Sequence, residues 1–105
     1  MTIVSVYAVF ANQAEAESIG RIVVEERLAA CINVLGQCRS IYRWQGTIEQ
    51  TDEVPAILKT DAAHIDALIA RIAELHCYAV PAIVAWPVHT ALAAYADWVD
   101  ASVFS

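Results

Sequence analysis

The 105-residue sequence has no apolar run long enough to cross a membrane and few residues that mark loops or linkers. A charged side chain interrupts every apolar stretch before the roughly 18 residues that a bilayer of about 30 Å requires. The first ten residues lack a cationic start and a cleavage signal, so we expect no signal peptide. With only three Gly and three Pro, the chain contains no visible linker or repeat. We therefore expect a single domain over residues 1–105, with no membrane partner.

Basic residues and paired cysteines are also scarce. Six Lys and Arg face twelve Asp and Glu, giving a net charge of −6, and the basic residues stand singly along the chain. Without a basic patch, nucleic acid is not an expected partner. The three cysteines form no C-x-x-C pair, and their odd number fits a reducing cytoplasm better than a disulfide framework.

What the sequence has in excess is apolar character. Hydrophobic residues make up 59% of the chain and charged residues only 17%, against about 25% charged residues in an average globular domain. A monomer of this size would expose much of that apolar surface to water. Because a membrane segment is not expected, the composition favours a homo-oligomer with a large subunit interface.

The first part of the chain alternates between strand and helix signals. Ile3–Phe10 is a short, nearly continuous apolar run, typical of a buried strand. Asn12 then offers an N-cap, and Glu15 stands three residues later as in a capping box. Apolar residues at helical spacing follow, predicting a helix to about Leu28. Residues 31–35 return to strand character.

A hairpin is predicted next. A strand ending at Trp44 is followed by Gln45–Gly46, which suits a tight turn because Gly accepts positive φ. The return strand is expected in two pieces, residues 47–49 and 54–60. Pro55 cannot donate a ladder hydrogen bond, so we expect it at a bulge or an edge position.

The last third carries the clearest helix signal. The helix is expected to begin at a cap, Thr60 or Asp61, and to end near His76. Its apolar residues recur at helical spacing: Ile65, Leu68, Ile69, Ile72 and Leu75. A strand over residues 82–88 and a short helix capped by Thr90 complete the chain. The order of elements predicts an α+β fold, a ferredoxin-like βαββαβ sandwich with an extra C-terminal helix.

No catalytic motif accompanies this pattern. The sequence contains no G-x-S-x-G, no Gly-rich phosphate loop and no H-E-x-x-H. We therefore expect a protein that is not an enzyme and carries no organic cofactor.

Five segments in order resemble those of the CutA divalent-cation-tolerance family. They are Glu25–Val34 (EERLAACINV), Ser40–Glu49 (SIYRWQGTIE), Leu58–Thr60 (LKT), His76–Ile83 (HCYAVPAI) and the closing Tyr95-x-x-Trp98. The resemblance implies a homotrimer in which long hairpin strands pair across subunits. It also implies an association with tolerance of copper and other divalent cations, through metal binding or signalling.

His76 and Cys77 are the candidate metal ligands, since imidazole and thiolate both suit copper or zinc. The alternative is that His76 only ends its helix, where the dipole favours it, and that Cys77 is a small buried hydrophobe. Gln45, Ala79 and Ala82 stand where the family pattern has carboxylates. A site built of oxygen ligands is therefore less expected here than a softer site for copper or another divalent cation, and loss of metal binding stays open.

A second candidate group is Tyr42, Trp44, Lys59 and Tyr78. By the family pattern these residues would come close to the His76 turn near a subunit boundary. Aromatic faces around one cation could hold a planar or small anionic ligand, as in a PII-like trimeric small-molecule sensor. The alternative is that Tyr42 and Trp44 pack across the hairpin while Lys59 extends past them.

Overall fold

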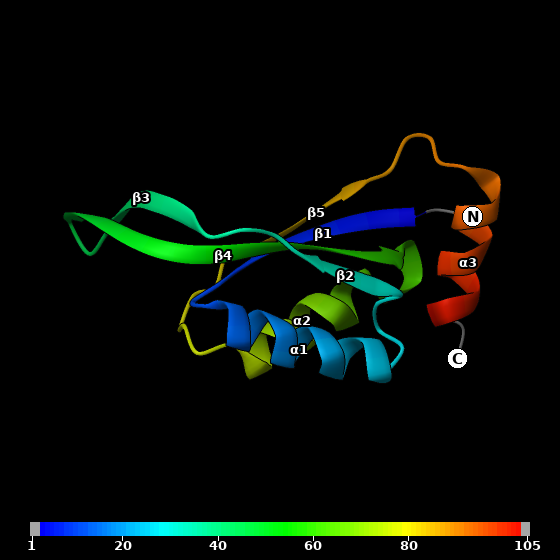
Figure 1. Ribbon diagram of the computed structural model, residues 1–105, viewed down its shortest axis with the longest axis horizontal. Helices are drawn as coiled ribbons and strands as arrows, with labels where there is room; N and C mark the ends of the chain where they lie inside the picture. The colour runs from blue at the N-terminus through cyan, green and yellow to red at the C-terminus, as the bar shows by residue number, and fades with distance from the viewer. Residues whose placement is uncertain (1–2, 104–105) are drawn as a thin grey trace.

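The computed structural model describes residues 3–103 of the protein, and its elements follow the predicted order (Figure 1). They are β1 (Ile3–Phe10), α1 (Gln13–Glu25), β2 (Cys31–Val34), β3 (Cys38–Trp44), β4 (Thr47–Asp61), a 3₁₀ turn η1 (Ala62–His64), α2 (Ile65–Leu75), β5 (Ile83–Pro87) and α3 (Ala93–Val103). The antiparallel sheet has the order β2-β4-β1-β5, and β3 also pairs with β4. The predicted α+β, ferredoxin-like plan with an added C-terminal helix is confirmed.

Helices α1 and α2 cover the same face of the sheet (Figure 1). The core between these helices and the sheet is made of side chains that are fully buried, among them Val6, Phe10, Leu58, Leu68 and Ile72. A smaller apolar cluster joins α3 to the start of β1 at one end of the molecule. At the other end, the β3–β4 hairpin extends well beyond the helices (Figure 1). None of the described helices is both long and apolar enough to cross a membrane.

Helix α1 begins as predicted but ends earlier. The Asn12 side chain accepts a 2.8 Å hydrogen bond from the Glu15 amide, as an N-cap does. The helix stops at Glu25, and the prediction of an end near Leu28 was wrong. Arg27 adopts φ 61°, and the Leu28 amide bonds back to the Val23 carbonyl, so the chain turns out of the helix in a left-handed C-terminal conformation.

Strand β4 runs unbroken over 15 residues rather than in two pieces. β2 and β3 pair end to end along the same edge of β4. Pro55 lies opposite Val9 of β1 without a bulge. The carbonyl of Pro55 accepts from the Leu35 amide, so its nitrogen faces the break between β2 and β3. Pro55 thus occupies a local edge, where no hydrogen bond from its nitrogen is needed.

The remaining boundaries shift by a few residues. Asp61 caps η1 by accepting from the His64 amide at 3.0 Å, whereas Thr60 donates its hydroxyl to the Leu28 carbonyl. Thr90 does not cap the last helix, which begins only at Ala93. At the hairpin tip, Gln45 and Gly46 both have positive φ, 51° and 82°, as a type I′ turn requires.

Candidate functional site

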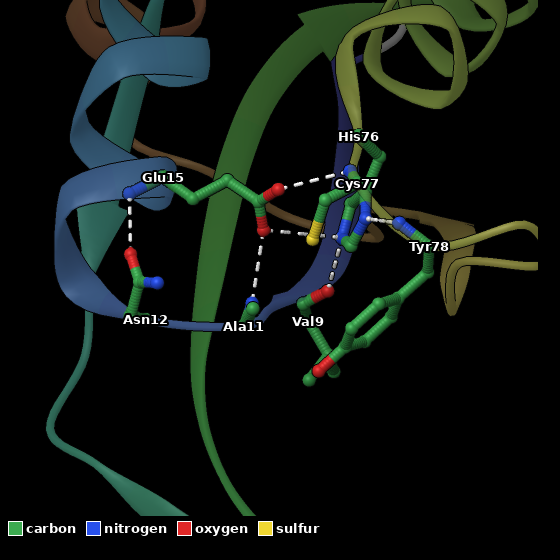
Figure 2. A network of polar contacts seen from close by, with 7 residues as sticks. All are labelled: Val9, Ala11, Asn12, Glu15, His76, Cys77 and Tyr78. Carbon is green, nitrogen blue, oxygen red and sulfur yellow. Dashed lines mark hydrogen bonds and ion pairs between the residues drawn. The ribbon is translucent and has the colours of Figure 1, made fainter.

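Two chain connections meet at one end of the strands β1 and β5 and bring together three side chains of types that can bind a metal. One connection leads from β1 into α1 and carries Glu15 in the first turn of the helix. The other leads from α2 toward β5 and carries His76 and Cys77 (Figure 2). One ligand atom from each of these three residues lies within 4.8 Å of the others. The structure thus places the two predicted ligands beside a third that was not predicted.

Glu15 is the centre of this cluster. Its carboxylate accepts hydrogen bonds from the Ala11 amide at 2.9 Å and from the Cys77 amide at 3.0 Å (Figure 2). One carboxylate oxygen also lies 3.7 Å from Nε2 of His76. Partial burial alone would raise the pKa of Glu15. Hydrogen bonds from the Cys77 side chain and from the Ala11 and Cys77 amides, with His76 nearby, outweigh it and lower the pKa. Glu15 is therefore an anion at neutral pH.

The His76 ring is fully buried and held on all sides. Its side chain is 0% exposed, its ring stacks on Phe10 at 5.4 Å, and Tyr78 lies 4.8 Å away. Nε2 lies 2.8 Å from the Val9 carbonyl, and Nδ1 lies 3.0 Å from the Tyr78 amide. A carbonyl can only accept and an amide N–H only donates, so these partners fix the neutral tautomer with its proton on Nε2. Coordination through Nε2 would therefore require the proton to move to Nδ1 and would break the hydrogen bonds to the Val9 carbonyl and the Tyr78 amide.

His76 also stands at the end of α2, where the alternative to metal binding places it. Its backbone N–H does close the end of α2 by bonding to the Ile72 carbonyl at 2.9 Å. Its ring, however, points to β1 and not to the carbonyls at the helix end. The ring therefore joins α2 to the end of β1, a function that the helix dipole does not explain.

Cys77 is exposed, so the alternative that it is a small buried hydrophobe was wrong. Its side chain shares a hydrogen bond with Glu15, and this bond, burial and the negative charge of Glu15 raise the pKa of the Cys77 thiol. The group is thus a thiol at neutral pH, and metal binding must displace its proton. The cluster offers oxygen, nitrogen and sulfur donors, a set that suits zinc or copper.

Glu15 was not predicted as a ligand because its position already explains it as a helix-capping residue. The sequence did hold a usable signal. β1 and β5 are antiparallel neighbours, so the residues that follow β1 lie beside those that precede β5. A carboxylate shortly after β1 and a His-Cys pair shortly before β5 should therefore be close.

Next to the cluster lies a pocket with a volume of about 750 Å³. Tyr42, Trp44 and Tyr78 line it together, and so do Ala79 and Ala82. Another lining residue, Glu53, was not predicted; it is only 7% exposed. Gln45 is an exposed residue of the hairpin turn.

Lys59 does not join this pocket within one chain. It pairs with Ser5 and Cys31, whereas Tyr42 pairs with Glu49, ten positions away along β4. At about 3.3 Å per residue this separation is about 30 Å. The predicted group of four therefore divides into three aromatic residues at the pocket and a distant lysine.

Known proteins resemble this chain over nearly its whole length. Residues 4–102 match the family model described as CutA1 divalent ion tolerance protein. Protein CutA of Mus musculus is 41% identical over 88 residues, which are 84% of this chain and 50% of that protein. The divalent-cation tolerance protein CutA of Thermus thermophilus is 42% identical over 83 residues, covering 79% of this chain and 81% of that one.

A solved structure of similar shape is that of CutA from Xylella fastidiosa. It superposes with a TM-score of 0.94 at 37% identity, covering 97% of this chain and 98% of that chain. By contrast, the chain spans about half the length of the mouse and human relatives that it matches.

Proposed function

The chain belongs to the CutA1 divalent ion tolerance family, and on that premise we propose that it binds a divalent cation, copper or zinc, at Glu15, His76 and Cys77. The observation that carries the proposal is the approach of three different donor atoms to within 4.8 Å of one another. The activity proposed is binding of the ion as cargo, without a chemical reaction, in keeping with relatives that are named for tolerance.

The three side chains would contribute differently. Glu15 is already ionised and supplies negative charge without losing a proton. Cys77 is exposed and gives the ion its first point of access, but only as a thiolate. His76 would enter last, because its proton must first move from Nε2 to Nδ1, which breaks the hydrogen bonds of the ring to Val9 and to Tyr78. Since the Cys77 thiol proton leaves, affinity should rise as pH rises.

Calorimetric titration with Zn²⁺ and Cu²⁺ tests the site. Cys77→Ala and Glu15→Gln should each weaken binding by at least about tenfold, the loss of about 1.4 kcal/mol. Cys38→Ala and Glu17→Gln are matched controls, since they remove the same groups elsewhere and should bind as wild type does. His76→Ala is less informative because it empties a buried site. Equal binding by wild type, Cys77→Ala and Glu15→Gln would rule out this site.

We also propose that the chain assembles as a homotrimer. Large apolar side chains are exposed on the hairpin, on β5, and on α3 and the residue before it: Ile41, Tyr42, Trp44, Ile48, Val84, Trp86, Leu92, Tyr95 and Trp98. So much exposed apolar surface is unusual for a monomer, and the CutA resemblance implies three subunits. Light scattering should give three times the 11.4 kDa chain mass. A mass of one chain at micromolar concentration would contradict the trimer and the inference of a homo-oligomer from the apolar composition.

The alternative of a PII-like sensor for a small anionic ligand gains no support from the comparisons. Its cationic residue, Lys59, also lies far from the aromatic group within one chain. A cytoplasmic location stays a prediction that rests on the cysteine content of the sequence.

A further inference from the structure

Strand β4 carries two oppositely charged side chains that have no ion-pair partner among residues 3–103. Glu53, near the base of the hairpin, is only 7% exposed, and Lys59, near the end of the strand, is half-buried. Neither takes part in an ion pair within the described chain. A charge held partly out of water costs free energy unless an opposite charge lies against it.

Glu53 and Lys59 cannot neutralise each other within one chain. Six positions separate them, an even number, so both side chains stand on the same face of β4. Leu58 packs into the core on the other face, under the helices. At about 3.3 Å per residue the two positions are about 20 Å apart along the strand, whereas the charged atoms of an ion pair lie within about 4 Å.

Exposed aromatic side chains surround Lys59. Cys31 pairs with Lys59 across β2 and β4, and Sγ of Cys31 lies 3.6 Å from the hydroxyl of Tyr95 in α3. On the other side, Ser5 of β1 stands between Lys59 and Trp86 of β5. Tyr95 and Trp86 are both exposed. We call this part of the molecule, Lys59 with Trp86, Tyr95 and Trp98, the α3 surface.

A second group of exposed aromatic side chains accompanies Glu53. Tyr42 and Trp44 of β3 line the same pocket as Glu53 and are exposed. We call these three residues the hairpin surface. Figure 1 shows the hairpin and α3 at opposite ends of the molecule, whose longest extent is 45 Å. The chain thus presents two distant apolar surfaces, one with a buried anion and the other with a half-buried cation.

We propose that in the homotrimer the hairpin surface of one copy packs on the α3 surface of the next, so that Lys59 of the partner subunit pairs with Glu53. The inference rests on the trimer proposed above. A closed ring of three copies is built from contacts in which one surface meets a different surface of the neighbour. The contact would cover both aromatic groups and neutralise both charges, and the ammonium group would also meet the electron-rich rings of Tyr42 and Trp44.

Charge also argues against contacts between like surfaces. Two hairpin surfaces packed on each other would bring two Glu53 carboxylates together, and two α3 surfaces would bring two Lys59 ammonium groups together. Like charges that face each other across an interface suppress such a contact. The two surfaces therefore favour a head-to-tail ring over a twofold dimer.

Charge reversal tests the pairing. Glu53→Lys and Lys59→Glu each place like charges in every contact, so each variant should dissociate at least about tenfold more readily than wild type, a difference of about 1.4 kcal/mol. The double reversal restores opposite charges with their positions exchanged, and its dissociation should return to within about threefold of wild type. Because the two positions are about 20 Å apart in one chain, such a rescue can act only between copies.

Light scattering over a dilution series measures dissociation, at a urea concentration that partly dissociates wild type, and circular dichroism establishes that each variant is folded. Glu25→Lys combined with Lys59→Glu is the matched control. It has the same net charge as the double reversal, but Glu25 is exposed on α1, so it should not rescue. If a reversed chain does not fold, Glu53→Gln and Lys59→Met replace the reversals, and their combined effect should be smaller than the sum of the single effects.

Three results would overturn the pairing while leaving the trimer in place. They are a trimer that dissociates no more readily after either reversal, a double reversal no more stable than the single ones, and additive effects of the two neutral variants. A wild-type protein that is a monomer would overturn the pairing and the trimer together.

Discussion

Replacing Glu15 with Gln should destabilise the protein more than any loss of one surface charge. The Glu15 carboxylate accepts amide hydrogen bonds from Ala11 at 2.9 Å and from Cys77 at 3.0 Å, which tie the start of α1 to the segment after α2. The Gln amide has one oxygen, so it can keep one of these bonds and presents an NH₂ group to the other donor. Because a hydrogen bond to a charged group contributes about 1.5–3 kcal/mol, we expect a loss of about 2 kcal/mol in the free energy of unfolding.

The loss should depend on pH in a defined direction. The pKa of Glu15 is lowered in the folded protein, so its contribution is present above the unfolded pKa of about 4.3 and is lost as pH falls through the lower folded value. Wild type and Glu15→Gln should therefore differ most near neutral pH and converge in acid.

Urea denaturation measures this difference, with every sample at one protein concentration because association shifts apparent stability. Glu17→Gln is the matched control. It removes the same charge from the same helix. Glu17 is exposed, and within residues 3–103 its side chain accepts a hydrogen bond only from Gln13, so its effect should stay within about 0.5 kcal/mol. Equal stabilities of the two variants at pH 7, or a Glu15→Gln deficit that does not shrink in acid, would refute the role assigned to the carboxylate.

Two further predictions concern packing and thiol chemistry. Gly20→Ala should destabilise the protein by about 1–3 kcal/mol, although Ala normally favours a helix, because the added Cβ would lie 2.7 Å from Cδ1 of Ile32. In an Ile32→Ala background the same change should stabilise the protein. Equal effects in both backgrounds would contradict the steric clash. Glu15→Gln should also speed alkylation of Cys77 by iodoacetamide, followed by peptide mass spectrometry, because Glu15 raises the pKa of that thiol; an unchanged rate would show that the thiol does not sense the carboxylate.

The order of elements could be predicted because periodicity reports burial directly. Leu68 and Ile72 recur at helical spacing and are fully buried against the sheet, and the apolar run of β1 lies between two other strands. Boundaries were less accurate, since they depend on single backbone conformations. Arg27 ends α1 by adopting a positive φ that residues with a side chain seldom adopt, so nothing in its identity marks the position.

The candidate site could be predicted only in part, because motifs show neighbours along the chain and not in space. His76 and Cys77 are adjacent in sequence, whereas Glu15 meets them where β1 ends and β5 is about to begin. Conversely, Tyr42 and Lys59 stand in motifs that resemble those of the CutA family, on the paired strands β3 and β4. β4 is long enough to separate the two residues. Register and strand length decide both cases, and neither is fixed by a local pattern.

A crystal of the protein soaked in Zn²⁺ and measured at the zinc absorption edge tests the central proposal most directly. We predict an anomalous peak about 2.3 Å from Sγ of Cys77 and about 2.0–2.2 Å from a carboxylate oxygen of Glu15. The His76 ring should then no longer donate a hydrogen bond to Val9. A crystal with ordered zinc elsewhere and none at Glu15 and Cys77 would contradict the account.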